Sequence, residues 1–73
     1  MTPSAAQYEV LQPYITDRVR ELVRGRLLEG VKFFDKRALR SEYTRSEVKL
    51  VLLLVKIANP TEALTSEEQR LLE

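Results

Sequence analysis

The sequence VKLVLLLVKIA of residues 48–58 decides the fold of this chain. At about 100° per residue, Lys49 and Lys56 fall on one narrow stripe of a helix, and apolar side chains cover the rest of its circumference. A helix that is hydrophobic nearly all round must be buried on several sides. We therefore expect this segment at the centre of a helical bundle, and in so short a chain we expect the bundle to be shared with a partner.

Both ends of this helix are marked in the sequence. Thr44 and Glu47 have the spacing of a capping box, in which each side chain accepts a hydrogen bond from the other residue's backbone N–H. Asn59 suits a left-handed residue after the last helical turn, and Pro60 cannot continue the helix. The signals predict a helix over residues 45–58.

Three other helical segments are expected, and no strand. A weaker capping box, Ser4 to Gln7, opens a short helix that runs until Pro13 interrupts it. Another capping box, Thr65 to Glu68, starts a last helix that contributes Leu71 and Leu72. The chain lacks the alternating pattern and the Asn-Gly or Asp-Gly turns that are typical of hairpins.

The remaining segment is a long helix of about residues 16–40, which Thr16 can cap. Its apolar residues share one face at helical spacing, and Phe33 and Phe34 fall back on that face beyond Gly30. We expect the helix to continue through Gly30, because one glycine in a helix interior costs only about 1 kcal/mol. The alternative is that Gly30 ends the helix and that residues 31–40 form a separate turn of helix.

The predicted fold is therefore all-α, a single domain of residues 1–73 in which a helical hairpin of about 16–40 against 45–58 is flanked by short terminal helices. Domains below roughly 70–80 residues seldom gain more than about 3–5 kcal/mol from one core. The sequence has no Cys and no His, so neither a disulfide nor an ordinary zinc site can reinforce it. We expect two copies to complete a helical bundle as a homodimer.

The residue inventory argues against catalysis. Acid–base chemistry at neutral pH most often uses His, and nucleophilic triads place His beside Ser or Cys. The carboxylate pairs Asp17 with Glu21 and Glu67 with Glu68 are interpreted as a solvated helix face and as charges at a helix start. We expect no enzymatic activity, no catalytic residues, no cofactor and no bound metal.

A basic cluster suggests a different function. The net charge is only +1, but residues 18–56 carry eleven Lys or Arg against five Asp or Glu, a balance of +6. Acidic residues are interleaved at i, i+3 spacing, which favours ion pairs along the helix over a continuous basic face. If the segment binds nucleic acid or another polyanion, the alternative function, the candidate residues are Arg20, Arg24, Lys32, Lys36, Arg37 and Arg40.

Protein–protein contact is the favoured function. Two adjacent Phe residues cannot both reach the same small core at full depth, so one is a candidate surface anchor. On the helix of residues 45–58, the side opposite the lysine stripe is the expected dimer face. The predicted interface residues are Phe33, Phe34, Val51, Leu54 and Ala58. We expect a small regulatory or adaptor protein with a protein partner, no membrane span and a cytoplasmic location.

Overall fold

The protein folds as a set of helices around one central helix. A computed structural model describes residues 5–35 and 42–73, and it contains no strand in these ranges. The elements are α1 (Ala5–Leu11), the 3₁₀ turn η1 (Gln12–Tyr14), α2 (Asp17–Arg24), the π-helical turn η2 (Gly25–Glu29), α4 (Arg45–Ala58) and α5 (Ser66–Leu72). The all-α prediction is confirmed.

Helix α4 begins and ends where the sequence predicts. The Thr44 hydroxyl accepts a hydrogen bond from the Glu47 amide at 3.1 Å, and the Glu47 carboxylate accepts one from the Thr44 amide at 3.0 Å. The predicted left-handed conformation of Asn59 is wrong, because its φ is −143°. Asn59 instead donates its amide hydrogen bond to Val55 at 2.8 Å, and the helix stops before Pro60.

The caps of two other helices are also confirmed. The Thr16 hydroxyl accepts a hydrogen bond from the Val19 amide at the start of α2. Thr65 and Glu68 form the predicted capping box at the start of α5. The predicted cap at Ser4 lies outside the described residues.

The continuous helix predicted over residues 16–40 is wrong. Regular α-helix ends at Arg24, and the π-helical turn η2 leads to Gly30, whose φ of 69° is left-handed. Helices commonly end at a residue in this left-handed conformation, which glycine adopts without strain. The alternative that Gly30 ends the helix is the correct one. A turn over residues 33–35 follows, and residues 36–40 lie outside the described residues.

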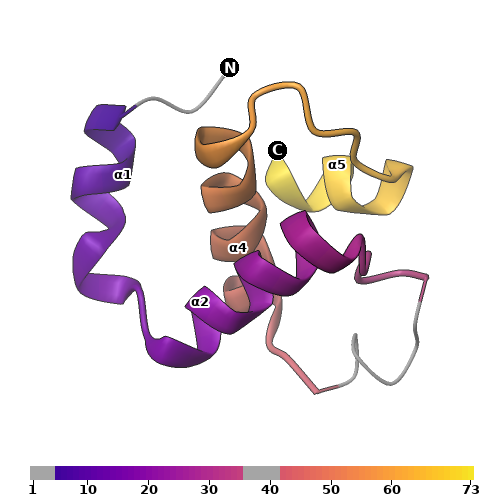
Figure 1. The fold of residues 1–73 in the computed structure, drawn as a ribbon, viewed down its shortest axis with the longest axis horizontal. Helices are drawn as coiled ribbons and strands as arrows, with labels where there is room; N and C mark the ends of the chain where they lie inside the picture. Colours follow the sequence, from indigo (N-terminus) through magenta and orange to yellow (C-terminus); the bar gives the residue numbers. More distant parts are fainter. Residues whose placement is uncertain (1–4, 36–41) are drawn as a thin grey trace.

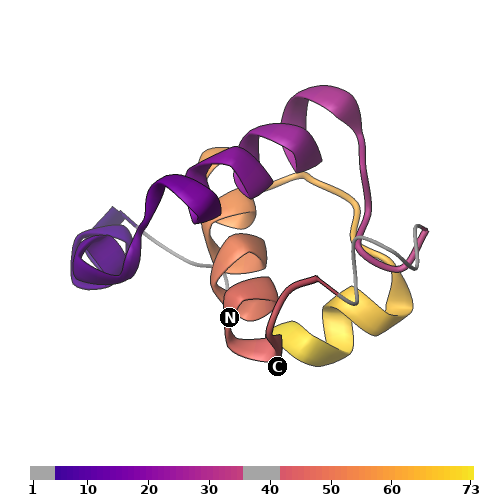
Figure 2. The ribbon, with the colours of Figure 1, turned by 90° about the horizontal axis from the view of Figure 1, so that it is seen from below.

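The core lies around α4. Helices α1 and α5 lie on opposite sides of α4, and α2 crosses it (Figures 1 and 2). A helix that is apolar nearly all round is thus enclosed by three other segments of the same chain. The buried apolar residues are Val19, Leu22, Phe33, Val48, Val51, Leu52, Leu54 and Val55.

The capping box of α4 is expected to contribute measurably to stability. Thr44→Ala removes the hydroxyl that accepts the Glu47 amide, and a lost N-cap typically costs about 1 kcal/mol. Urea unfolding followed by helical circular dichroism measures the change. Ser46→Ala is the control, since Ser46 is an exposed residue of the same helical turn. Equal midpoints for the two variants would contradict the assigned role of Thr44.

Candidate interaction surface

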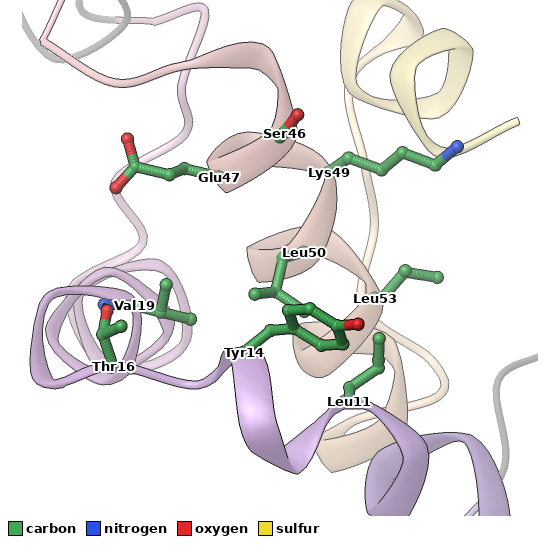
Figure 3. A pocket seen from close by; sticks show the side chains of 9 residues that line it. All are labelled: Leu11, Tyr14, Thr16, Val19, Ser46, Glu47, Lys49, Leu50 and Leu53. Carbon is green, nitrogen blue, oxygen red and sulfur yellow. The ribbon is translucent and has the colours of Figure 1, made fainter.

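An apolar groove lies where α1 and η1 meet the first half of α4. Its volume is about 450 Å³. In Figure 3, Leu11 and the ring of Tyr14 face Leu50 and Leu53 of α4, while the side chains of Glu47 and Lys49 point away from this cluster. The groove is lined by Leu11, Tyr14, Thr16, Val19, Ser46, Glu47, Lys49, Leu50 and Leu53.

The local sequence explains why these apolar groups stay accessible. Pro13 lies in the first turn of η1, a position where its missing N–H is tolerated, and η1 redirects the chain from α1 into α2. Tyr14 at the end of this turn is 66% exposed. Val10, on the last turn of α1, is 71% exposed and lines an adjoining hollow together with Leu11 and Leu53 of the groove. Contiguous apolar groups of this kind, rimmed by polar residues, are typical of protein interaction sites.

The structure places most of the predicted interface residues elsewhere. Val51, Leu54 and Phe33 are buried in the core of the single chain, with exposed fractions of 0%, 5% and 1%. None of the three presents more than a small part of its surface to solvent in this structure. Phe34 is half-buried and Ala58 is exposed.

The accessible apolar side of α4 is a different one from the predicted dimer face. Leu50 and Leu53 are half-buried, and both line the groove beside the exposed Lys49. The apolar side next to Lys49 is therefore accessible, whereas on the side opposite the lysines Val51 and Leu54 are buried and Ala58 is exposed.

The structure brings together only part of the predicted basic cluster. Arg20 and Arg24 are exposed on α2 and line one hollow beside Ala58. Lys32 lies beyond Gly30 and is half-buried. The other three candidates, Lys36, Arg37 and Arg40, lie outside the described residues.

A buried ion pair joins η2 to α5, and sequence reasoning did not predict it. Arg26 is 1% exposed and Glu68 is 0% exposed. The Arg26 guanidinium donates to both carboxylate oxygens of Glu68, through Nη2 at 3.1 Å and Nε at 3.3 Å. It also donates to the Glu62 carboxylate at 2.6 Å and to the Ala63 carbonyl at 2.9 Å. The only sequence signal was the position of Arg26 near the apolar stripe of its helix.

Glu68 has further partners that hold it in the charged form. Its carboxylate accepts hydrogen bonds from the backbone amides of Thr65 at 3.0 Å and Phe33 at 3.2 Å. Burial alone would raise the pKa of Glu68, but these amides and the Arg26 guanidinium outweigh burial, so the pKa lies below its usual value of 4.5. Burial would lower the pKa of Arg26, but its hydrogen bonds to the carboxylates of Glu68 and Glu62 and their negative charges raise it above its usual value. Arg26 and Glu68 therefore form a buried ion pair in which both side chains stay charged and which joins η2 to α5. This ion pair is called the clasp below.

The free energy of unfolding is expected to fall in acid because of this clasp. The unfolded chain binds a proton at Glu68 near its usual pKa of 4.5, while the folded chain resists protonation. The stabilisation is thus complete above that pH and is lost as the pH falls through the lower, folded pKa. Urea unfolding at pH 7 and pH 3 should show a smaller loss of stability in Glu68→Gln than in the wild type. An equal loss in both proteins would contradict the role of Glu68.

A second, exposed ion pair connects α2 to the start of α4. Arg18 Nε donates to Glu47 at 2.8 Å, and the Arg18 guanidinium lies 4.4 Å from the centre of the Tyr43 ring. Glu47 already caps α4, so one carboxylate serves both the cap and the contact with α2. Hydrogen bonds from Thr44 and the charge of Arg18 lower the pKa of Glu47.

Comparisons with known proteins give no relative. No protein family, no curated protein and no solved structure matches the chain. Within residues 5–35 and 42–73, no helix has the length and apolar character needed to cross a bilayer. In the same residues, no group of three or more carboxylates is arranged to hold a metal ion.

Proposed function

We propose that this chain is a small, non-catalytic regulatory or adaptor protein that acts through protein–protein contact at the apolar groove. The observation that carries the proposal is the open lining of Leu11, Tyr14, Leu50 and Leu53 in a chain whose other large apolar residues on α4 are buried, apart from the half-buried Ile57. A protein partner that covers these groups removes apolar surface from water, which favours binding by roughly 25 cal/mol per Å² of buried apolar surface.

The use of the charged residues supports the same proposal. Arg26 and Glu68 form the buried clasp, and Arg18 and Glu47 join α2 to α4. These groups hold helices together, which leaves them unavailable for acid–base chemistry. The absence of His and Cys from the sequence agrees with a non-catalytic role.

The nucleic-acid alternative has weaker support. This alternative requires one arginine-rich helix over residues 17–40. In the structure, α2 ends at Arg24 and η2 ends at Glu29, so the arginines do not lie on one continuous helix. Arg26 is buried against carboxylates, and Arg18 is paired with Glu47. Of the arginines on α2, only Arg20 and Arg24 are left for phosphate, and these two alone are few for the contacts that dominate affinity for nucleic acid. The candidates Lys36, Arg37 and Arg40 lie outside the described residues.

In this proposal, a second copy of the chain covers the groove when the partner protein is absent, and the partner protein takes its place when it binds. We expect a homodimer in which the grooves of two copies face each other, with Leu50 and Leu53 in place of the buried Val51 and Leu54 as interface residues. Light scattering at micromolar concentration is expected to give the mass of a dimer. Leu53→Gln should raise the dissociation constant at least about tenfold, equivalent to about 1.4 kcal/mol.

The control is Leu28→Gln. Leu28 is 74% exposed and does not line the groove, so this variant should remain a dimer. Circular dichroism of both variants shows whether the helices are retained. A dimer that is equally weakened by both variants would place the contact outside the groove.

Capture from a lysate of the native cells tests the adaptor role. Wild-type and Leu28→Gln baits are expected to retain the same protein, identified by mass spectrometry, and the Leu53→Gln bait is expected to lose it. If the chain is monomeric and no retained protein depends on Leu53, the proposed function is wrong.

A further inference from the structure

A second hollow lies between α1, α2 and the last turn of α4, and it shares no residue with the groove. Its volume is about 280 Å³. We propose that this hollow binds an acidic peptide segment of a partner protein, which inserts an aliphatic side chain and places its carboxylates on Arg20 and Arg24. The proposal adds a class of partner to the function proposed above and rests on it. The lining residues are Tyr8, Ile15, Arg20, Val23, Arg24, Leu54 and Ala58.

The interior of the hollow is aliphatic. Leu54 is almost completely buried, Ile15 and Val23 are half-buried, and the small side chain of Ala58 leaves the end of α4 open. The volume is below the roughly 300–1,000 Å³ of sites that enclose a whole small molecule. It suits one or two side chains of a larger partner, such as a Leu or Ile that projects from a peptide.

The edge of the hollow carries two cations that are available for binding. Arg20 and Arg24 are four residues apart on α2, so they lie on the same side of the helix. Arg20 contacts Asp17 at 3.4 Å, but both side chains are largely exposed, and such pairs are weak. Arg24 makes no hydrogen bond or ion pair with any residue that the structure describes. Arg18 and Arg26 are held more closely, because Arg18 binds Glu47 at 2.8 Å and Arg26 binds Glu62 and Glu68 in the interior.

The aliphatic interior of the hollow, together with Arg20 and Arg24 at its edge, favours an acidic peptide as the partner. Guanidinium groups bind carboxylates through two parallel hydrogen bonds, which sets the position of an acidic side chain. An aliphatic floor beside them recognises a neighbouring apolar side chain. A single-stranded nucleic acid would use the arginines but not the aliphatic interior, since unpaired bases bind by stacking on aromatic rings and Tyr8 is the only aromatic residue among the described residues that line the hollow.

A random 12-residue peptide library displayed on phage is an unbiased probe of this site. Wild-type protein is expected to enrich peptides that contain Asp or Glu next to Leu, Ile or Val. The double variant Arg20→Gln with Arg24→Gln is expected to lose these peptides. The matched control is Arg45→Gln with Arg70→Gln, which removes the same charge from two exposed arginines at another hollow, near Phe34.

Fluorescence anisotropy of the most enriched peptide gives the size of the effect. The Arg20 and Arg24 double variant should weaken binding at least about tenfold, whereas the control variant should change it less than about twofold. Ala58→Trp, which fills the open end of the hollow at an exposed position, should also weaken binding. A version of the peptide with Lys in place of Asp and Glu should not bind. Circular dichroism of every variant checks that a loss of binding is not a loss of the helical fold.

Several results would overturn the inference. They are failure to enrich any peptide, enrichment without acidic residues, and equal binding by the two double variants. Tighter binding of single-stranded DNA or RNA at physiological salt, lost in the Arg20 and Arg24 variant, would assign the hollow to nucleic acid instead. Leu53→Gln separates the two proposals, because it should abolish contacts made at the groove and leave peptide binding at the hollow unchanged.

Discussion

Arg26→Ala is expected to remove about 3–5 kcal/mol from the free energy of unfolding, which is comparable with the entire stability of a small domain. The variant would leave the carboxylate of Glu68, 0% exposed, without the guanidinium that binds both of its oxygens. A buried charge without its partner is far costlier than the loss of an exposed ion pair. Urea unfolding followed by circular dichroism measures the change.

Two further variants make this result specific to the clasp. Arg20→Ala removes an exposed arginine from the same stretch of helix and should change stability by less than about 1 kcal/mol. Glu68→Gln keeps the shape of the side chain and one oxygen acceptor, so its effect should fall between the two. If Arg26→Ala does not fold, Glu68→Gln still gives a measurable value. Equal free energies of unfolding for Arg26→Ala and Arg20→Ala would show that the clasp does not stabilise the fold.

The helix starts could be predicted from the sequence because their signals are local. Thr16, Thr44 and Thr65 each accept a hydrogen bond from an amide three residues later, as N-cap residues do. These interactions depend only on residues within one turn. The end of α4 was likewise predicted, since Pro60 cannot continue a helix whatever surrounds it.

The break at Gly30 could not be decided from local preferences. A glycine inside a helix costs about 1 kcal/mol, which favoured continuity. In the structure, the left-handed Gly30 turns the chain so that the Phe33 amide donates to Glu68 and the Phe33 ring enters the core. In a continuous helix that amide would donate to Glu29 instead. The tertiary contacts of Phe33 outweigh the local preference, and a sequence does not reveal them.

The clasp was missed for a related reason. Arg26 and Glu68 are 42 residues apart, and helical spacing identifies only partners within one or two turns. The burial of Val51 and Leu54 within the single chain could not be predicted either, because a helix with apolar residues on nearly every side gives no preference among those sides. Which side stays open depends on how α1, α2 and α5 pack around α4, and this packing leaves Leu50 and Leu53 accessible.

Leu54→Lys is expected to unfold the single chain rather than release a folded monomer from a dimer. Leu54 is 5% exposed in the core of one chain, so an ammonium group at this position loses its hydration without gaining a partner. Arg20 and Arg24 line the same hollow as Leu54, and their charges repel the new cation. The loss should therefore exceed the roughly 2–5 kcal/mol typical of Leu→Ala in a core.

The charge dependence of this effect tests the environment of Leu54. Leu54→Glu should also destabilise the protein, but less than Leu54→Lys, because the two arginines attract a carboxylate. Leu28→Lys, at a position that is 74% exposed, should have little effect and serves as the matched control. Circular dichroism melts and sedimentation of the three variants distinguish unfolding from dissociation. A folded, monomeric Leu54→Lys would contradict the burial of Leu54 within one chain, and a Leu54→Glu as unstable as Leu54→Lys would show that Arg20 and Arg24 do not act on this hollow.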